Sequence, residues 1–160
     1  MASLKHSTRI LYVSDDQDDV FLLQVVAEEA GFHNLVCLSP NGEIRAVMEY
    51  LLKESRTELP NVIVVDARIP PCDGFQILKS IREQPRFNQI FISIVTDSED
   101  YLDNLKKHHP GLRADGFLRK PFSVENLEEM HMKFHMFRVS LEGERCGIWN
   151  LAVDGRDSQC

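Results

Sequence analysis

The chain has 160 residues, of which 43% are hydrophobic and 27% are charged, and its formal net charge is −7. This length and composition predict one soluble globular domain with a proper core, and they exclude a disordered or fibrous chain. The acidic balance argues against nonspecific nucleic-acid binding, and no apolar run reaches the length of a membrane span or signal peptide. The four cysteines are scattered without a CxxC pair, which is typical of reduced thiols, so we expect a cytoplasmic protein with no nucleic-acid or membrane partner.

Short β-rich runs alternate with longer amphipathic runs in the first part of the sequence. Strands are expected at residues 9–14, 35–39 and 61–66. The run NVIVVD at 61–66 is apolar almost throughout, which predicts a strand buried on both faces, as in a parallel sheet. We expect Asp18 to cap the first helix and Gly31 to end it, and a second helix to occupy residues 42–54.

The second part continues the same alternation. A loop with Pro70 and Pro71 precedes a helix that is expected from Gly74 to about Arg82, and a buried strand follows at 91–96. Ser98 is expected to cap the next helix, and residues 115–121 form a short fifth strand that ends at a proline. This (βα)5 order predicts an α/β fold in which a doubly wound, parallel five-stranded sheet is covered by helices on both faces.

A helical tail follows the fifth strand. Its first apolar stripe is expected to pack on the sheet and comprises Met130, Phe134, Phe137 and Leu141. A second stripe lacks an obvious core partner and suits a homodimer or a docked partner protein; it comprises Met132, Met136 and Val139. Three residues on one helical face are interpreted as a solvated polar face rather than a metal site: Glu128, His131 and His135. His108 and His109 are interpreted in the same way, as a solvated end of the preceding helix.

The tail also sets the expected division of the chain. We expect a domain over residues 1–138 and a tail over 139–160, for which a role as an interaction segment is one interpretation. Trp149 is a candidate anchor of this tail, either to the body or to a partner.

Polar residues gather where the predicted strands end. Ser14, Asp15 and Asp16 follow the first strand, and three further strands end at or run into Asp66, Thr96 and Lys120. In a doubly wound sheet this edge is where ligands bind. Each residue alone would suit a turn or a helix cap, but neighbouring acids also suit Mg²⁺, and an aspartate beside Mg²⁺ can attack phosphorus. The lysine ammonium and the threonine hydroxyl would then contact phosphoryl oxygens, so the set predicts a phosphoryl-transfer site.

The motifs that carry these residues resemble a known family. They are VSDD, VVDARIPPCDG, IVTDS and FLRKPF, with intervals of 51, 30 and 24 residues between Asp15, Asp66, Thr96 and Lys120. Over residues 8 to 138 the chain resembles the receiver domain of two-component response regulators, with the flavodoxin-like fold of the chemotaxis regulator. Its opening ILYVSDDQDDVFLL is similar to stand-alone receivers that serve sensor kinases, including bacteriophytochromes.

The resemblance implies a role for each site residue. Asp66 would accept a phosphoryl group from a phosphohistidine on a sensor histidine kinase or a phosphotransfer protein. Asp15, Asp66 and the backbone carbonyl of Arg68 would bind Mg²⁺. Thr96 and Lys120 would sense the phosphoryl group, and Phe117 would swing inward as a switch, although a core aromatic is an alternative for it. The Lys120–Pro121 peptide would be cis.

Ser14 departs from the family pattern, because it occupies the place of the first acid of the usual pair. We expect a lowered but not abolished Mg²⁺ affinity, with Ser14 or Asp16 contributing through a water molecule. The leading interpretation is a single-domain response regulator that signals by binding and is not an enzyme. The alternative is a pseudo-receiver, a binding module with little or no phosphorylation. A phosphatase is disfavoured because Arg68 stands where its acid/base aspartate would be.

Overall fold

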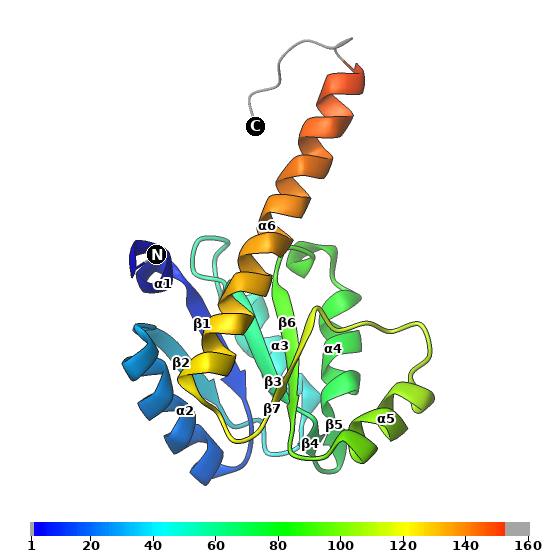
Figure 1. Ribbon diagram of the computed structural model, residues 1–160. Helices are drawn as coiled ribbons and strands as arrows, with labels where there is room; N and C mark the ends of the chain where they lie inside the picture. The colour runs from blue at the N-terminus through cyan, green and yellow to red at the C-terminus, as the bar shows by residue number, and fades with distance from the viewer. Residues whose placement is uncertain (1, 153–160) are drawn as a thin grey trace.

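The computed structural model describes the backbone of residues 2–152 and the side chains of residues 5–143. A parallel five-stranded sheet forms its centre, in the order β2-β1-β3-β6-β7 (Figure 1). The strands are β1 (Arg9–Val13), β2 (Asn34–Leu38), β3 (Val62–Asp66), β6 (Phe91–Thr96) and β7 (Gly116–Arg119). The chain passes from β1 outward to β2 and then back to β3 on the other side of β1. This reversal confirms the doubly wound fold and places a ligand-binding edge beyond the ends of β1 and β3.

Helices cover both faces of the sheet. On one face lie α2 (Gln17–Ala30) and α6 (Val124–Ala152), and on the other lie α3 (Ile44–Lys53), α4 (Gly74–Arg82) and α5 (Glu99–His108). Neighbouring residues of one strand serve opposite cores: Leu11 packs toward α3 and α4, whereas Tyr12 packs toward α2 and α6. Every residue of β3 and β6 is buried, which confirms that these apolar runs are central strands.

Helix α6 is longer than the sheet that it covers. Met130 and Phe134 are buried against the sheet and Phe137 packs beside them, as expected for the first stripe. Met132, Met136 and Val139 of the second stripe are 66%, 67% and 53% exposed. The helix crosses residue 138 without a break and continues beyond the body of the molecule (Figure 1). The side chain of Trp149 lies outside the described residues.

Several short elements were not expected from the sequence. The N-terminal segment forms a helix, α1 (Ala2–Ser7). The loop after β3 contains a small hairpin of β4 (Arg68–Ile69) and β5 (Cys72–Asp73), and a 3-10 turn, η1, occupies Pro85–Phe87. The Lys120–Pro121 peptide is cis, as the family resemblance implied, and so is Pro70–Pro71.

Three sequence-based assignments of helix caps and solvated helix residues are wrong. The cap of α2 is Asp16 rather than Asp18, because the Asp16 carboxylate accepts hydrogen bonds from the backbone N–H groups of Asp18 and Asp19. His131 is buried between Phe32 and Phe134 and lies 3.4 Å from the Thr8 hydroxyl, so it is not on a solvated face.

The third wrong assignment concerns His109. This residue is not a solvated helix end, because its ring stacks on Phe75 and its Nε2 lies 3.6 Å from the Asp73 carboxylate.

Candidate functional site

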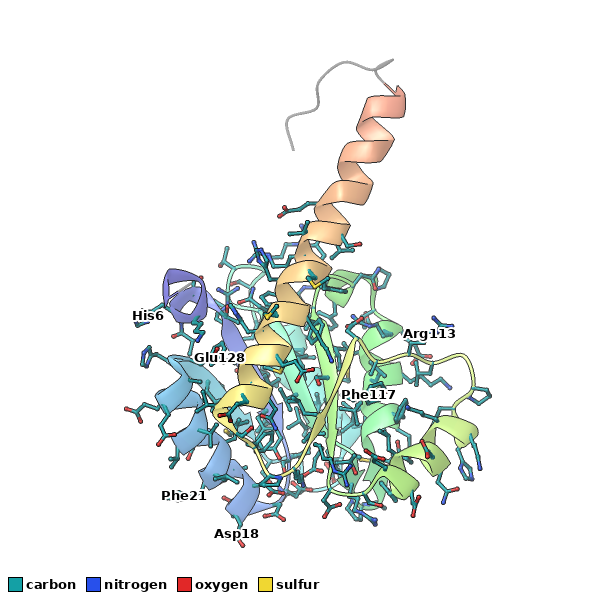
Figure 2. All side chains as sticks on the ribbon, in the orientation of Figure 1. His6, Asp18, Phe21, Arg113, Phe117 and Glu128 are labelled. Atoms are coloured by element: carbon teal, nitrogen blue, oxygen red, sulfur yellow. The ribbon has the colours of Figure 1, made fainter. Side chains whose placement is uncertain are left out.

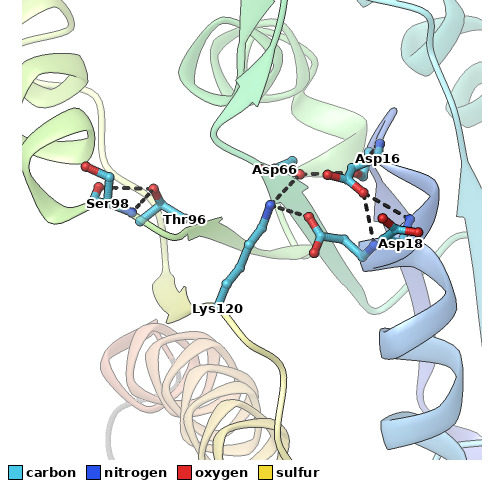
Figure 3. A network of polar contacts seen from close by, with 8 residues as sticks. Asp16, Asp18, Asp66, Thr96, Ser98 and Lys120 are labelled. Carbon is cyan, nitrogen blue, oxygen red and sulfur yellow. Dashed lines mark hydrogen bonds and ion pairs between the residues drawn. The ribbon is translucent and has the colours of Figure 1, made fainter.

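The carboxyl edge of the sheet brings together the side chains that the sequence placed at strand ends (Figure 3). Asp66 is the last residue of β3, between β1 and β6, and is 3% exposed. The Ser14 hydroxyl, just after β1, donates a hydrogen bond to Asp66 Oδ2 at 3.0 Å. Lys120 Nζ, just after β7, donates to the same oxygen at 3.0 Å. Both side-chain donors described for Asp66 therefore bind the same carboxylate oxygen, Oδ2.

Burial dominates the electrostatics of Asp66. Removal from water raises the pKa of this carboxyl group, and the hydrogen bonds and charge of Lys120, together with the Ser14 hydroxyl and the Arg68 backbone, offset this rise only in part. Asp66 therefore takes up a proton more readily than an exposed aspartate does. The neighbouring Tyr12 hydroxyl is fully buried, and burial first, then the charge of Asp66, raises its pKa, so it stays neutral.

Lys120 is bound by two carboxylates at once. Its Nζ lies 2.5 Å from Asp19 Oδ2 and 3.0 Å from Asp66 Oδ2. Burial by itself lowers the pKa of the Lys120 ammonium, but the hydrogen bonds and charges of Asp19 and Asp66 outweigh it, and the pKa is raised. The lysine is thus charged at neutral pH. Sequence reasoning did not assign Asp19 to the site, because the direction of its side chain depends on α2 beginning at Gln17, directly after the Asp16 cap.

Asp15 does not contact Asp66 in this structure. Its Oδ1 accepts hydrogen bonds from the Ser39 hydroxyl at 2.7 Å and the Asn41 N–H at 2.8 Å, and its Oδ2 accepts one from the Gly42 N–H at 2.8 Å. Asn41 and Gly42 both have positive φ angles, a backbone form that points consecutive N–H groups at an anion. The loop between β2 and α3 thus binds the Asp15 carboxylate as an anion.

The two expected switch residues face away from Asp66. The Thr96 hydroxyl is bound to the backbone of Ser98 (Figure 3). Phe117 is 39% exposed, and Lys106 Nζ lies 4.4 Å from the centre of its ring. Phe117 is therefore on the surface in this conformation, and the alternative of a core aromatic is wrong.

Residues 10–131 match the family model of the response regulator receiver domain. The chain belongs to this family. Among curated relatives, it is 34% identical over 116 residues to the alkaline phosphatase synthesis transcriptional regulatory protein PhoP of Bacillus subtilis, which covers 72% of this chain and 43% of PhoP. The receiver thus spans less than half the length of that relative.

Solved structures include receivers of the same shape. The bacteriophytochrome response regulator RtBRR aligns with a TM-score of 0.65 and 22% identity, over 79% of this chain and 77% of its own, which shows the fold. The Mn²⁺-bound form of response regulator Rcp1 aligns with a TM-score of 0.56 and 27% identity, over 81% of this chain and 88% of its own. None of the helices described for this receiver combines the length and apolarity needed to cross a membrane.

The receiver has oxygen donors of the kind that Mg²⁺ prefers. They are the carboxylates of Asp15 and Asp66 and the backbone carbonyl of Arg68, the set that the family resemblance implied. Among the residues with described side chains, no three histidine, cysteine or acidic side chains are grouped closely enough to hold a metal ion. Two features explain this: Ser14 replaces an acid, and the carboxylate of Asp15 is bound to the loop at residues 39–42. The donors fit Mg²⁺ by their chemistry, and Asp15 would have to exchange loop contacts for the metal.

Proposed function

We propose that this receiver is a cytoplasmic, single-domain phosphorylation switch in which Asp66 is the phosphoacceptor. The observation that carries the proposal is the pair of donors on one oxygen of a buried carboxylate. Lys120 and Ser14 both bind Asp66 Oδ2 and thereby fix the orientation of the carboxylate at the ligand-binding edge of the sheet.

The phosphoryl group would come from a phosphohistidine of a phytochrome-like sensor histidine kinase, of another sensor histidine kinase, or of a phosphotransfer protein. An Asp66 oxygen forms the new O–P bond while the P–N bond of the donor breaks. The bonding electrons remain on the imidazole nitrogen, which takes a proton from solvent. Bound Mg²⁺, held by Asp15, Asp66 and the Arg68 carbonyl, would neutralise charge on the phosphoryl oxygens. Lys120 supplies the second positive charge from the protein itself.

The donor protein needs an apolar surface next to this site. Phe21 and Val25 on α2 are 68% and 41% exposed, and they follow Asp19 on the same helix. Phe21 lies at the outer edge of the molecule, near Asp18 (Figure 2). We propose that the phosphodonor docks on the surface formed by Phe21 and Val25. This surface is apolar and exposed, and it lies on α2, the helix whose Asp19 contacts Lys120.

The output of the switch would pass through Thr96 and Phe117. On phosphorylation, the Thr96 hydroxyl would leave Ser98 for a phosphoryl oxygen, and Phe117 would turn inward from its exposed position. Met132, Met136 and Val139 on α6 provide a second surface, and we propose that it binds another copy of the chain. Light scattering of the wild type and of a Met132→Glu/Met136→Glu variant tests this: a dimer that the variant abolishes is expected, and a monomeric wild type contradicts it.

Incubation with acetyl phosphate and Mg²⁺, followed by intact mass measurement, tests the phosphoacceptor. The wild type is expected to gain one phosphoryl group and Asp66→Asn to gain none. The alternative is a pseudo-receiver, favoured by Ser14 and by the engagement of Asp15 with the loop. A wild type that gains no phosphoryl group from acetyl phosphate or from a cognate kinase would support that alternative.

A further inference from the structure

Lys120 reaches Asp66 from a fixed base. Its backbone N–H donates to the Thr96 carbonyl oxygen at 2.9 Å, which ties the start of the side chain to the end of β6. The far end of the side chain is bound by Asp19 and Asp66, and all three side chains are largely buried, with 16%, 21% and 5% exposure. A charged pair that is shielded from water is stronger and better oriented than one on the surface.

Asp19 is itself held in place by the helix start. Its backbone N–H donates to the Asp16 carboxylate, which caps α2, so the first turn of the helix fixes the direction of the Asp19 side chain. The chain Asp16–Asp19–Lys120–Asp66 is therefore a continuous set of contacts from the helix cap to the phosphoacceptor (Figure 3).

The charge balance explains why two carboxylates share one lysine. With Ser14 uncharged, Asp66 and Lys120 alone would sum to zero, and the ammonium would neutralise the nucleophile. Asp19 draws the ammonium toward itself, at 2.5 Å against 3.0 Å for Asp66, and brings the sum of the three charges to −1. The lysine ammonium is then shared between Asp19 and Asp66 and does not pair with Asp66 alone. It is available to an incoming phosphoryl oxygen.

From this geometry we propose that Asp19 is a positioning residue for phosphoryl transfer to Asp66, and that it acts by holding the Lys120 ammonium. The proposal rests on the proposed function of Asp66. Asp19 touches neither the phosphoryl group nor the reacting oxygen. Its carboxylate sets where the lysine stands before transfer, and a loss of that carboxylate leaves the lysine paired with the nucleophile alone.

The neighbouring Asp18 offers a matched control. Asp18 and Asp19 both lie in the first turn of α2, and Asp18 is exposed, with no partner for its carboxylate within the described residues. Asp18→Asn and Asp19→Asn thus remove the same charge from the same turn. A general loss of negative charge would speed reaction with an anionic phosphodonor, whereas a mispositioned lysine would slow it. The two effects have opposite signs.

The experiment measures the rate of adduct formation with acetyl phosphate over a range of concentrations, by intact mass, well below the melting temperature of each variant. We expect Asp19→Asn to lower the limiting rate about tenfold, which corresponds to about 1.4 kcal/mol. We expect Asp18→Asn to leave the rate equal or slightly higher, and Asp19→Glu, which keeps the charge, to recover part of the loss. Equal rates for Asp19→Asn and Asp18→Asn would overturn the proposal.

A second measurement does not depend on phosphorylation. NMR of the lysine ammonium groups is expected to give the same Lys120 Nζ chemical shift in the wild type and in Asp18→Asn, and a different shift in Asp19→Asn, where the ammonium is left with Asp66 alone. Failure of the wild type to form an adduct would contradict the proposed function of Asp66. A Lys120 Nζ chemical shift that Asp19→Asn leaves unchanged would contradict the role of Asp19 itself.

Discussion

The Thr96 hydroxyl donates a hydrogen bond to the Ser98 carbonyl oxygen and accepts one from the Ser98 N–H, both at 3.0 Å. This closed ring engages the hydroxyl within its own loop and leaves it no bond to Asp66. Ser98 also caps α5 through its side chain, which accepts from the Tyr101 N–H. The Thr96 hydroxyl is thus connected to the start of α5, which is the helix that supplies Lys106 to the ring of Phe117.

Thr96→Ala is expected to separate phosphorylation from switching. The alanine still permits the adduct on Asp66, but no hydroxyl can move from Ser98 to a phosphoryl oxygen, so Phe117 should remain exposed. Aromatic NMR of Phe117 with and without acetyl phosphate measures this. Ser98→Ala is the control, because it removes a hydroxyl from the same loop but keeps both backbone bonds to Thr96. A wild-type shift of Phe117 that persists in Thr96→Ala would contradict the coupling.

Ser14→Asp is expected to strengthen divalent metal binding and to lower the thermal stability of the metal-free protein. A carboxylate in place of the buried Ser14 hydroxyl would lie beside Asp66, where the hydrogen bond now is, and two like charges there repel each other unless a cation intervenes. We expect Mn²⁺ to bind about tenfold more tightly, a gain of about 1.4 kcal/mol, and the melting temperature without metal to fall. Calorimetry and thermal unfolding measure the two effects. Ser55→Asp adds the same charge at an exposed loop position and should change neither.

The strand-end residues could be predicted from the sequence because their positions follow from topology alone. Once the apolar runs at 61–66 and 91–96 are recognised as central parallel strands, Asp66 and Thr96 must lie at one edge, and Lys120 reaches the same edge from β7. No side-chain orientation is needed for that inference.

The roles of the acids after β1 could not be predicted in the same way. Asp15, Asp16, Asp18 and Asp19 are all able to cap a helix, and which one does so depends on where the backbone first becomes helical. The structure begins α2 at Gln17, which makes Asp16 the cap and turns Asp19 toward Lys120. The burial of His131 likewise depends on tertiary contacts, because Thr8 and Phe32 pack against it and neither is near it in sequence.

Gly42→Ala is expected to destabilise the fold through a backbone clash. Gly42 has φ +72°, and a Cβ there would lie 2.3 Å from the Pro70 carbonyl oxygen, in the loop that follows Asp66. Gly111 has φ +83° and no atom within 4 Å of a Cβ. Gly111→Ala should therefore cost only the strain of the left-handed backbone, about 1 kcal/mol, and Gly42→Ala should cost at least about 3 kcal/mol in the free energy of unfolding. Urea unfolding measures both, and equal losses would contradict the close contact.

His131 is expected to make the fold less stable in mild acid. Burial, together with the nearby charges of Lys5 and His135, lowers the pKa of its imidazole, and Glu128 opposes this only weakly. Below the ordinary histidine pKa of about 6.5, the unfolded chain takes up a proton that the folded chain refuses. The free energy of unfolding therefore falls as the pH drops below that value, and the loss is absent at neutral pH and above.

His131→Gln tests this because glutamine stays neutral and keeps a polar group near the Thr8 hydroxyl, to which His131 Nε2 lies at 3.4 Å. Urea unfolding between pH 7.5 and pH 5 should show a shallower slope in the variant, by up to about 1.4 kcal/mol per pH unit, the limit for one proton. His135→Gln is the matched control, because His135 lies one turn further along α6 and is exposed. A slope that His131→Gln leaves unchanged would mean that His131 is protonated as easily in the folded protein as in the unfolded chain.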